Sequence, residues 1–194
     1  MGLSVMILGL VLFFAAHVFT TKRELRAKVR ARLGENTYKI LYSLVSLVGL
    51  VLIVRGFAHY RVVGEIGVWN PPKAFKHLAE ILMLPAVILV VASYIRGRIF
   101  TALKHPMLAS IMLWAAGHLL ANGDLGAIIL FGSFLVWAVY DRISMIWRSD
   151  NGAPPIPVGG VTNDLIAVVA GVVAYLALAF VFHPLVIGIP VVGS

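Results

Sequence analysis

The sequence has no cysteine, and charged residues make up only 12% of its 194 residues. The absence of cysteine excludes disulfides, thiolate metal ligands and cysteine nucleophiles. Soluble domains usually carry about 25% charged residues, so this low fraction and a mean hydropathy of +0.98 indicate a membrane protein. The net charge of +8 does not indicate nucleic-acid binding, because the bases lie in short stretches between apolar runs without an aromatic platform.

Long apolar runs dominate the rest of the sequence. A helix needs about 20 apolar residues to cross about 30 Å of hydrocarbon. Segments that qualify, or nearly so, run roughly over residues 2–20, 38–57, 75–95, 105–121, 125–146 and 164–184. The fourth and fifth are separated by the turn-forming residues Asn122, Gly123 and Asp124, which predict a helical hairpin. We therefore predict an all-α fold, a polytopic membrane helix bundle of about six transmembrane helices, with residues 1–194 as one domain.

Lysine and arginine are distributed unequally between the loops, and basic loops stay in the cytoplasm. The odd-numbered loops and their flanks hold Lys22, Arg23, Arg26, Lys28, Arg30, Arg32, Lys39, Arg96, Arg98, Lys104, Arg142 and Arg148. The even-numbered ones hold Arg55, Arg61, Lys73 and Lys76. We therefore expect the odd loops in the cytoplasm. In a bacterium this predicts a multi-pass inner-membrane protein with both termini in the periplasm.

The first loop, "TKRELRAKVRARLGEN", has apolar residues at every fourth position, namely Leu25, Val29 and Leu33. Bases surround them, and Gly34 is a plausible helix end. One interpretation is an interfacial helix on anionic cytoplasmic lipid. The other is a solvated basic loop, and the sequence does not choose between them.

The fourth predicted span carries polar residues at regular places. Ser110, Trp114, His118 and Asn122 are spaced by four, so they share one face of a helix. Polar groups in a span usually point into the bundle, because lipid cannot satisfy them. His118 is therefore either a histidine that hydrogen-bonds a neighbouring helix, or one that binds a ligand or handles protons.

The other histidines stand alone or near expected span ends. His17 is the one ionisable residue in the first span. His105 precedes a proline at the start of the fourth span, where proline is an ordinary first helical residue. His77 and Glu80 open the third span, and His183 lies at the outer end of the sixth.

No catalytic motif accompanies these histidines. The sequence has no glycine-rich phosphate loop, no G-x-S-x-G and no H-E-x-x-H. Zinc sites use three or four clustered ligands, whereas a haem needs one or two. Histidines without cysteine, in spans with almost no carboxylates, therefore suit a haem better than a hydrolytic zinc site.

Three stretches resemble the NnrU family of integral membrane proteins. The central one is "KHPMLASIMLWAAGHLLANGDLGAIILFGSFLVWAVYDRIS". The others are "FFAAHVFTTKRELRAKVRARLGENTYKILYSLVSLVGLVLIV" near the start and "NDLIAVVAGVVAYLALAFVFHPLVIGIPVV" near the end. Together they cover nearly the whole chain, and the His-Pro element followed by His-Leu-Leu-Ala-Asn-Gly-Asp is specific.

The resemblance implies a function and a cofactor. Bacterial members of the family are associated with denitrification and nitric oxide metabolism, and the plant relatives are ζ-carotene isomerases that hold haem b through histidines. Their two axial ligands fall on His118 and His17 of this sequence. The plant pattern has a cysteine three residues before the second ligand, where this chain has Ala115.

The depth of each histidine leaves the second axial ligand open. At 1.5 Å per residue, His17 lies about 8 Å from the inner end of its helix and His118 about 21 Å. Two ligands of one iron should lie at similar depth. By depth His17 pairs better with His105, and His118 pairs better with His77 or His183.

Three functions therefore compete. The first is a haem-b-binding protein that acts on nitric oxide or an apolar small molecule from the bilayer, as an isomerase or a nitric oxide-responsive factor. The second is a non-catalytic assembly or regulatory factor with structural histidines. The third is a membrane methyltransferase, because Lys104-His105-Pro106 resembles an element of isoprenylcysteine-type enzymes. The paired glutamates expected downstream are missing from "YDRISMIWRSD".

The unequal distribution of bases predicts the location of the C-terminus. A reporter that is active only in the periplasm, fused after Ser194, is expected to be active. A reporter that is active only in the cytoplasm is expected to be silent at the same place. Clear activity of the cytoplasmic reporter would reverse the predicted orientation.

Overall fold

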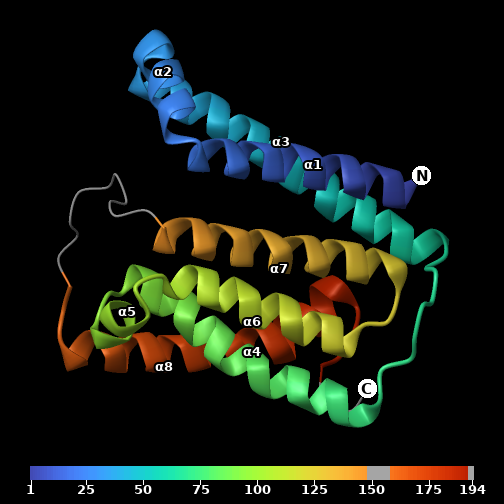
Figure 1. Ribbon diagram of the computed structural model, residues 1–194. Coiled ribbons are helices and arrows are strands. Elements are labelled where there is room, and N and C mark those ends of the chain that lie inside the picture. Colours follow the sequence, from blue (N-terminus) through green and yellow to red (C-terminus); the bar gives the residue numbers. More distant parts are fainter. Residues whose placement is uncertain (148–157, 192–194) are drawn as a thin grey trace. The chain divides into compact units, whose positions relative to one another are not determined.

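The computed structural model describes residues 1–147 and 158–191, and helices account for most of them (Figure 1). The helices are α1 (Gly2–Thr21), α2 (Arg23–Leu33), α3 (Glu35–Val63), α4 (Lys73–Tyr94), α5 (Arg98–Leu103), α6 (Pro106–Ala121), α7 (Leu125–Ile146), α8 (Val161–Ala177) and η1 (Leu178–Ile187), a π-helix. Within the described ranges, β pairing is limited to an isolated bridge between Gly67 and Asp124. The predicted all-α fold class is confirmed.

Each of the six predicted spans is a helix in the structure. Five are long and apolar enough to cross a membrane: α1, α3, α4, α7 and the continuous run of α8 and η1. The sixth, α6, is apolar but has 16 residues, which corresponds to about 24 Å. The first loop forms the helix α2, as one of its two interpretations predicted, whereas α5 was not predicted. Arg148 and most of the loop before the last span lie outside the described residues.

Large apolar side chains cover the outside of these helices. On α3, Leu44, Val48 and Val51 are exposed, and on α8 Val169 and Val173 are exposed. Exposed apolar surface of this extent is unfavourable in water and favourable in hydrocarbon. The length and composition of the helices therefore indicate a multi-pass protein in a lipid bilayer.

The residues group into two compact units. The first comprises Met1–Asn70 and Gly123–Trp137, and the second comprises Pro71–Asn122 and Ala138–Ser194. The boundary passes through α7, whose two halves belong to different units.

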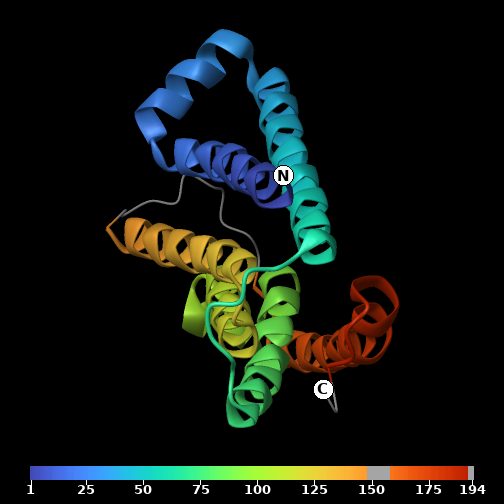
Figure 2. The ribbon, with the colours of Figure 1, turned by 90° about the vertical axis from the view of Figure 1, so that its right-hand side faces the viewer.

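In the first unit, α1 and α3 run side by side (Figures 1 and 2) and are held together by glycines. A Cβ built on Gly9 would lie 2.7 Å from the carbonyl oxygen of Gly49, and one built on Gly2 would lie 2.8 Å from that of Gly56. The first glycine of α1 faces the second of α3, so the helices are antiparallel. Small residues at such an interface let two backbones approach closely in lipid.

The turn between α6 and α7 is tied to the segment after α3 within the first unit. Gly123 accepts hydrogen bonds from the backbone N–H groups of Val68 (2.8 Å) and Trp69 (3.1 Å), and Leu125 donates to the carbonyl of Ile66 at 2.8 Å. Three residues separate α6 from α7, as the sequence predicted.

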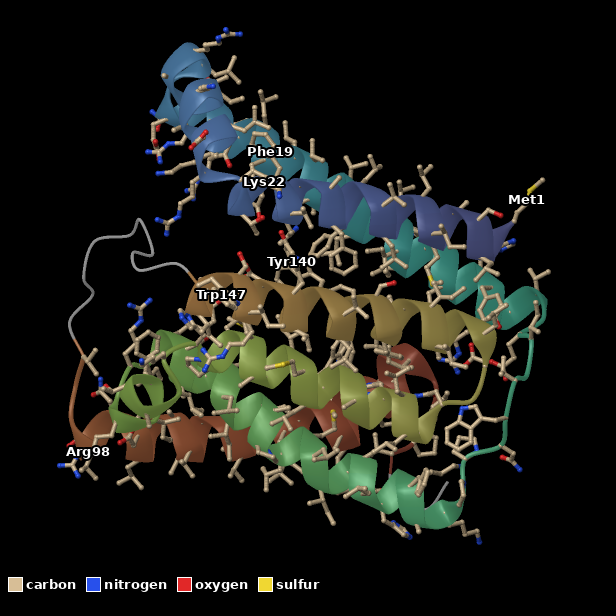
Figure 3. The ribbon with its side chains drawn as sticks, viewed as in Figure 1. Met1, Phe19, Lys22, Arg98, Tyr140 and Trp147 are labelled. Carbon is tan, nitrogen blue, oxygen red and sulfur yellow. The ribbon has the colours of Figure 1, made fainter. Side chains whose placement is uncertain are left out.

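The second unit is built on contacts of α4 with α6 and α8. A Cβ on Gly171 of α8 would lie 2.7 Å from the Cα of Ile88 of α4, so these helices also meet at a glycine. In the first turn of α8, the carboxylate of Asp164 accepts hydrogen bonds from the backbone N–H groups of Arg98 (3.1 Å) and Ile99 (3.0 Å) and so caps α5. Figure 3 shows Arg98 beside the first turn of α8.

The glycine contact between α1 and α3 predicts a difference between two identical substitutions. In Gly56→Ala the new Cβ would lie 2.7 Å from the Cα of Met6, and such overpacking costs about 1–3 kcal/mol. Gly132→Ala on α7 is the control, because no atom lies within 4 Å of its added Cβ. We expect thermal unfolding in detergent to show a lowered Tm for Gly56→Ala alone. Equal Tm values would contradict the proposed packing.

Candidate functional site

The helix that carries His118 is fixed on α4. Its start follows from Pro106 at the first helical position, after His105. Ser110, which is only 2% exposed, donates its hydroxyl to the carbonyl of Ala86 at 2.7 Å. Two turns on, Gly117 lies against α4, where an added Cβ would be 3.4 Å from the carbonyl oxygen of Ala79. Part of the polar face of α6 is therefore used for helix packing.

Asn122 closes α6 through the backbone of His118 and not through its ring. Its side-chain amide donates to the carbonyl oxygen of His118 at 2.8 Å, and its backbone N–H donates to the same oxygen at 2.9 Å. These bonds satisfy a carbonyl that the end of a helix leaves without an intrahelical partner. The polar face therefore contains two structural residues, Ser110 and Asn122, on either side of an aromatic pair.

That pair is Trp114 and His118, whose ring centroids are 5.1 Å apart. His118 is partly buried, and its Nδ1 lies 2.9 Å from the carbonyl oxygen of Trp114. Because a carbonyl can only accept, Nδ1 carries the proton and donates it. In the neutral ring, Nε2 then carries the lone pair that can bind a metal.

His183 lies close to His118 within the second unit. The two ring centroids are 6.4 Å apart, and the ring planes are inclined by 29°. The Nδ1 of His183 lies 3.0 Å from the carbonyl oxygen of Leu178, so the same argument places the proton on Nδ1. Of the two partners that depth left open for His118, His183 is the one whose ring is nearby.

The backbone around His183 is a π-helix, a rare form that often occurs at functional sites. Pro184 has no N–H and disturbs the regular α-helical pattern at this place. The wider helix ends at Gly188, which has a φ of 78° and donates to the carbonyl of His183 at 2.9 Å. The sequence showed the His-Pro pair but gave no signal for the π-helix.

His17 lies in the first unit, in an aromatic environment. Its Nδ1 lies 2.7 Å from the carbonyl oxygen of Phe13, and the two rings stack with centroids 4.0 Å apart. Tyr42 and Trp137 are also near, with ring centroids at 5.6 Å and 5.4 Å. Within the described residues, the Nε1 of Trp137 in this cluster is buried without a hydrogen-bond partner. His17 and His118 belong to different units, so their pairing stays a prediction.

The remaining histidines have surface or boundary positions. His77 is exposed, and its Nδ1 lies 3.6 Å from a carboxylate oxygen of Glu80. His105 caps α6, and His59 is exposed on α3. Among the described residues, no three His, Asp or Glu side chains are close enough together to hold a metal ion. A zinc site of three protein ligands is therefore absent from this part of the chain.

The model of the NnrU protein family matches residues 5–191. The chain belongs to the NnrU family. The match includes all six histidines and, apart from the first residues of α1, the six helices that were predicted as spans. No curated protein and no solved structure matches this NnrU protein.

The donor set of this NnrU protein fits a haem. Haem iron takes one or two ligands from the protein, and histidine is a common one. Histidines that bind metals almost always donate their other ring N–H to a carbonyl, a carboxylate or water. His17, His118 and His183 each do so toward a carbonyl of their own helix, which leaves the Nε2 lone pair as the donor of each ring.

The observed role of Asn122 predicts that its removal affects stability. Asn122→Ala loses the 2.8 Å side-chain bond to the carbonyl of His118, and a typical hydrogen bond contributes about 0.5–1.5 kcal/mol. Asn36→Ala, at an exposed position in the first turn of α3, is the control. We expect a lower Tm for Asn122→Ala only. A Tm equal to that of the control would show that the cap does not stabilise the protein.

Proposed function

We propose that this NnrU protein binds haem b in the membrane and that His118 is an axial ligand of the iron. The observation that carries the proposal is the pairing of two imidazoles in the second unit, with ring centroids 6.4 Å apart and both Nδ1 atoms engaged with carbonyls. Two imidazoles this close together would be able to hold one metal ion between them.

The surroundings of His118 supply what an axial histidine needs. The bond from Nδ1 to Trp114 fixes the tautomer and the ring orientation and raises the basicity of the other nitrogen. The exposed apolar faces of the helices support a site in hydrocarbon, where a polar ring would gain from a metal bond what it loses by desolvation. The hydroxyl of Ser110 fixes α6 on α4, and the amide of Asn122 closes the end of α6.

A bound haem supplies one-electron redox chemistry and an iron that can take a small ligand. Membership of the NnrU family supports a role in nitrogen-oxide metabolism or a ζ-carotene-isomerase-like reaction. Nitric oxide and a carotenoid both partition into lipid, which suits a site in an apolar bundle. The chain has no cysteine, and Ala115 stands where the plant pattern has one, so this chain would offer such a haem no thiolate.

Removal of the His118 imidazole is the first test. We expect His118→Ala, expressed with haem in excess and purified in detergent, to insert normally and lose most of its Soret absorbance. His59→Ala is the control, because His59 is exposed on α3, and it should keep the spectrum. Full haem content in His118→Ala would show that the histidine is structural, and so would a colourless wild-type protein.

His17 and His183 are the two candidates for a second ligand beside His118. The same substitution at each position distinguishes between them. The family resemblance implies His17, whereas the ring contact within the second unit favours His183. We expect His183→Ala to convert a six-coordinate low-spin spectrum to a five-coordinate high-spin one. His17→Ala should leave the spectrum six-coordinate. The reverse result would assign the position to His17.

A further inference from the structure

A strongly basic junction joins α1, α2 and α3 in the first unit. Residues 22–39 hold seven bases and two acids. Glu35 contacts Arg30 and lies 3.1 Å from the Nζ of Lys39, so one carboxylate is already shared by two cations. Figure 3 shows Phe19 and Lys22 at the bend between α1 and α2, where the first long apolar helix ends.

Two polar groups at this junction are buried without partners. Tyr38 is 7% exposed, and its hydroxyl has no hydrogen-bond partner among the described residues. The Nε of Arg26 is likewise buried and without a partner, and the guanidinium carbon lies 6.0 Å from the centroid of the Tyr38 ring. A buried donor without a partner is unfavourable, so each such group calls for a hydrogen-bond acceptor.

The apolar side of α2 is exposed in the described part of the chain. Leu25 is 50% exposed and Leu33 is 44% exposed, and they lie on the apolar stripe of α2. A helix with bases on one side and exposed apolar side chains on the other is suited to the boundary between lipid headgroups and acyl chains. Hydrogen-bond acceptors at this boundary include the phosphates of phospholipids, which carry acyl chains.

We propose that the junction of α1, α2 and α3 binds the headgroup of one anionic phospholipid. Its phosphate accepts hydrogen bonds from the Nε–H of Arg26 and the O–H of Tyr38, and its acyl chains lie along Leu25 and Leu33. The phosphate balances part of the excess positive charge, and bonds from charged donors to phosphate are among the strong ones. This site is independent of the proposed haem.

General attraction of a basic loop to anionic lipid makes a different prediction. Each base near the surface would then contribute similarly to lipid binding, whichever base is removed. The headgroup site predicts that Arg26 matters more than an exposed base of α2 such as Arg32. It also predicts that Tyr38, which is uncharged, matters.

Lipid titration of the full-length protein tests the site. Delipidated protein in neutral detergent is titrated with phosphatidylglycerol, and bound lipid is counted by native mass spectrometry. We expect one tightly held lipid on the wild type and on Arg32→Gln. Arg26→Gln and Tyr38→Phe should each hold it about tenfold more weakly while keeping the wild-type circular dichroism spectrum.

Two controls complete the test. Inorganic phosphate at the same concentration should not displace the lipid, because it lacks the acyl chains, and displacement would identify a free-phosphate site and overturn the proposal. Arg32→Gln that weakens binding as much as Arg26→Gln would also overturn it, in favour of general attraction. Unchanged lipid binding in both Arg26→Gln and Tyr38→Phe would overturn the headgroup site as well.

Discussion

Hydrocarbon offers no hydrogen bonds, so each polar group inside these helices must find its partner within the protein. Three histidines meet this constraint in the same way, by donating from Nδ1 to a carbonyl of their own helix four or five residues back. The bond that satisfies the ring also decides its chemistry, because the lone pair is left on Nε2. The proposed haem site depends on this single feature.

The same constraint governs the helices that carry the histidines. The hydroxyl of Ser110 donates to a carbonyl of α4, and the amide of Asn122 donates to the carbonyl of His118 on α6. The glycines of α1 and α3 allow close contact between the two backbones. The exceptions in the described part of the first unit include the hydroxyl of Tyr38 and the indole of Trp137, which have no hydrogen-bond partner there. We attribute the first of them to lipid.

Much of the fold could be predicted from the sequence, because span length and apolar composition are local properties. The six apolar helical segments and the short turn at Asn122–Asp124 follow from such properties. For α2 the sequence left a helix and a solvated loop as equal alternatives, and the structure shows the helix. The helix α5 could not be predicted, because its six residues are fixed by the distant carboxylate of Asp164. The polar face of α6 was predicted from its spacing, but the division between structural residues and His118 depends on which atoms meet. The proximity of His183 arises from a π-helix that periodicity does not indicate.

The central claim is that imidazoles of this NnrU protein hold a haem b. The electron paramagnetic resonance spectrum of the ferric wild-type protein, purified after expression with haem in excess, tests it most directly. The account predicts a low-spin signal typical of two imidazole ligands, at about one haem per chain. A preparation without a haem signal, or one with only a high-spin signal, would contradict it.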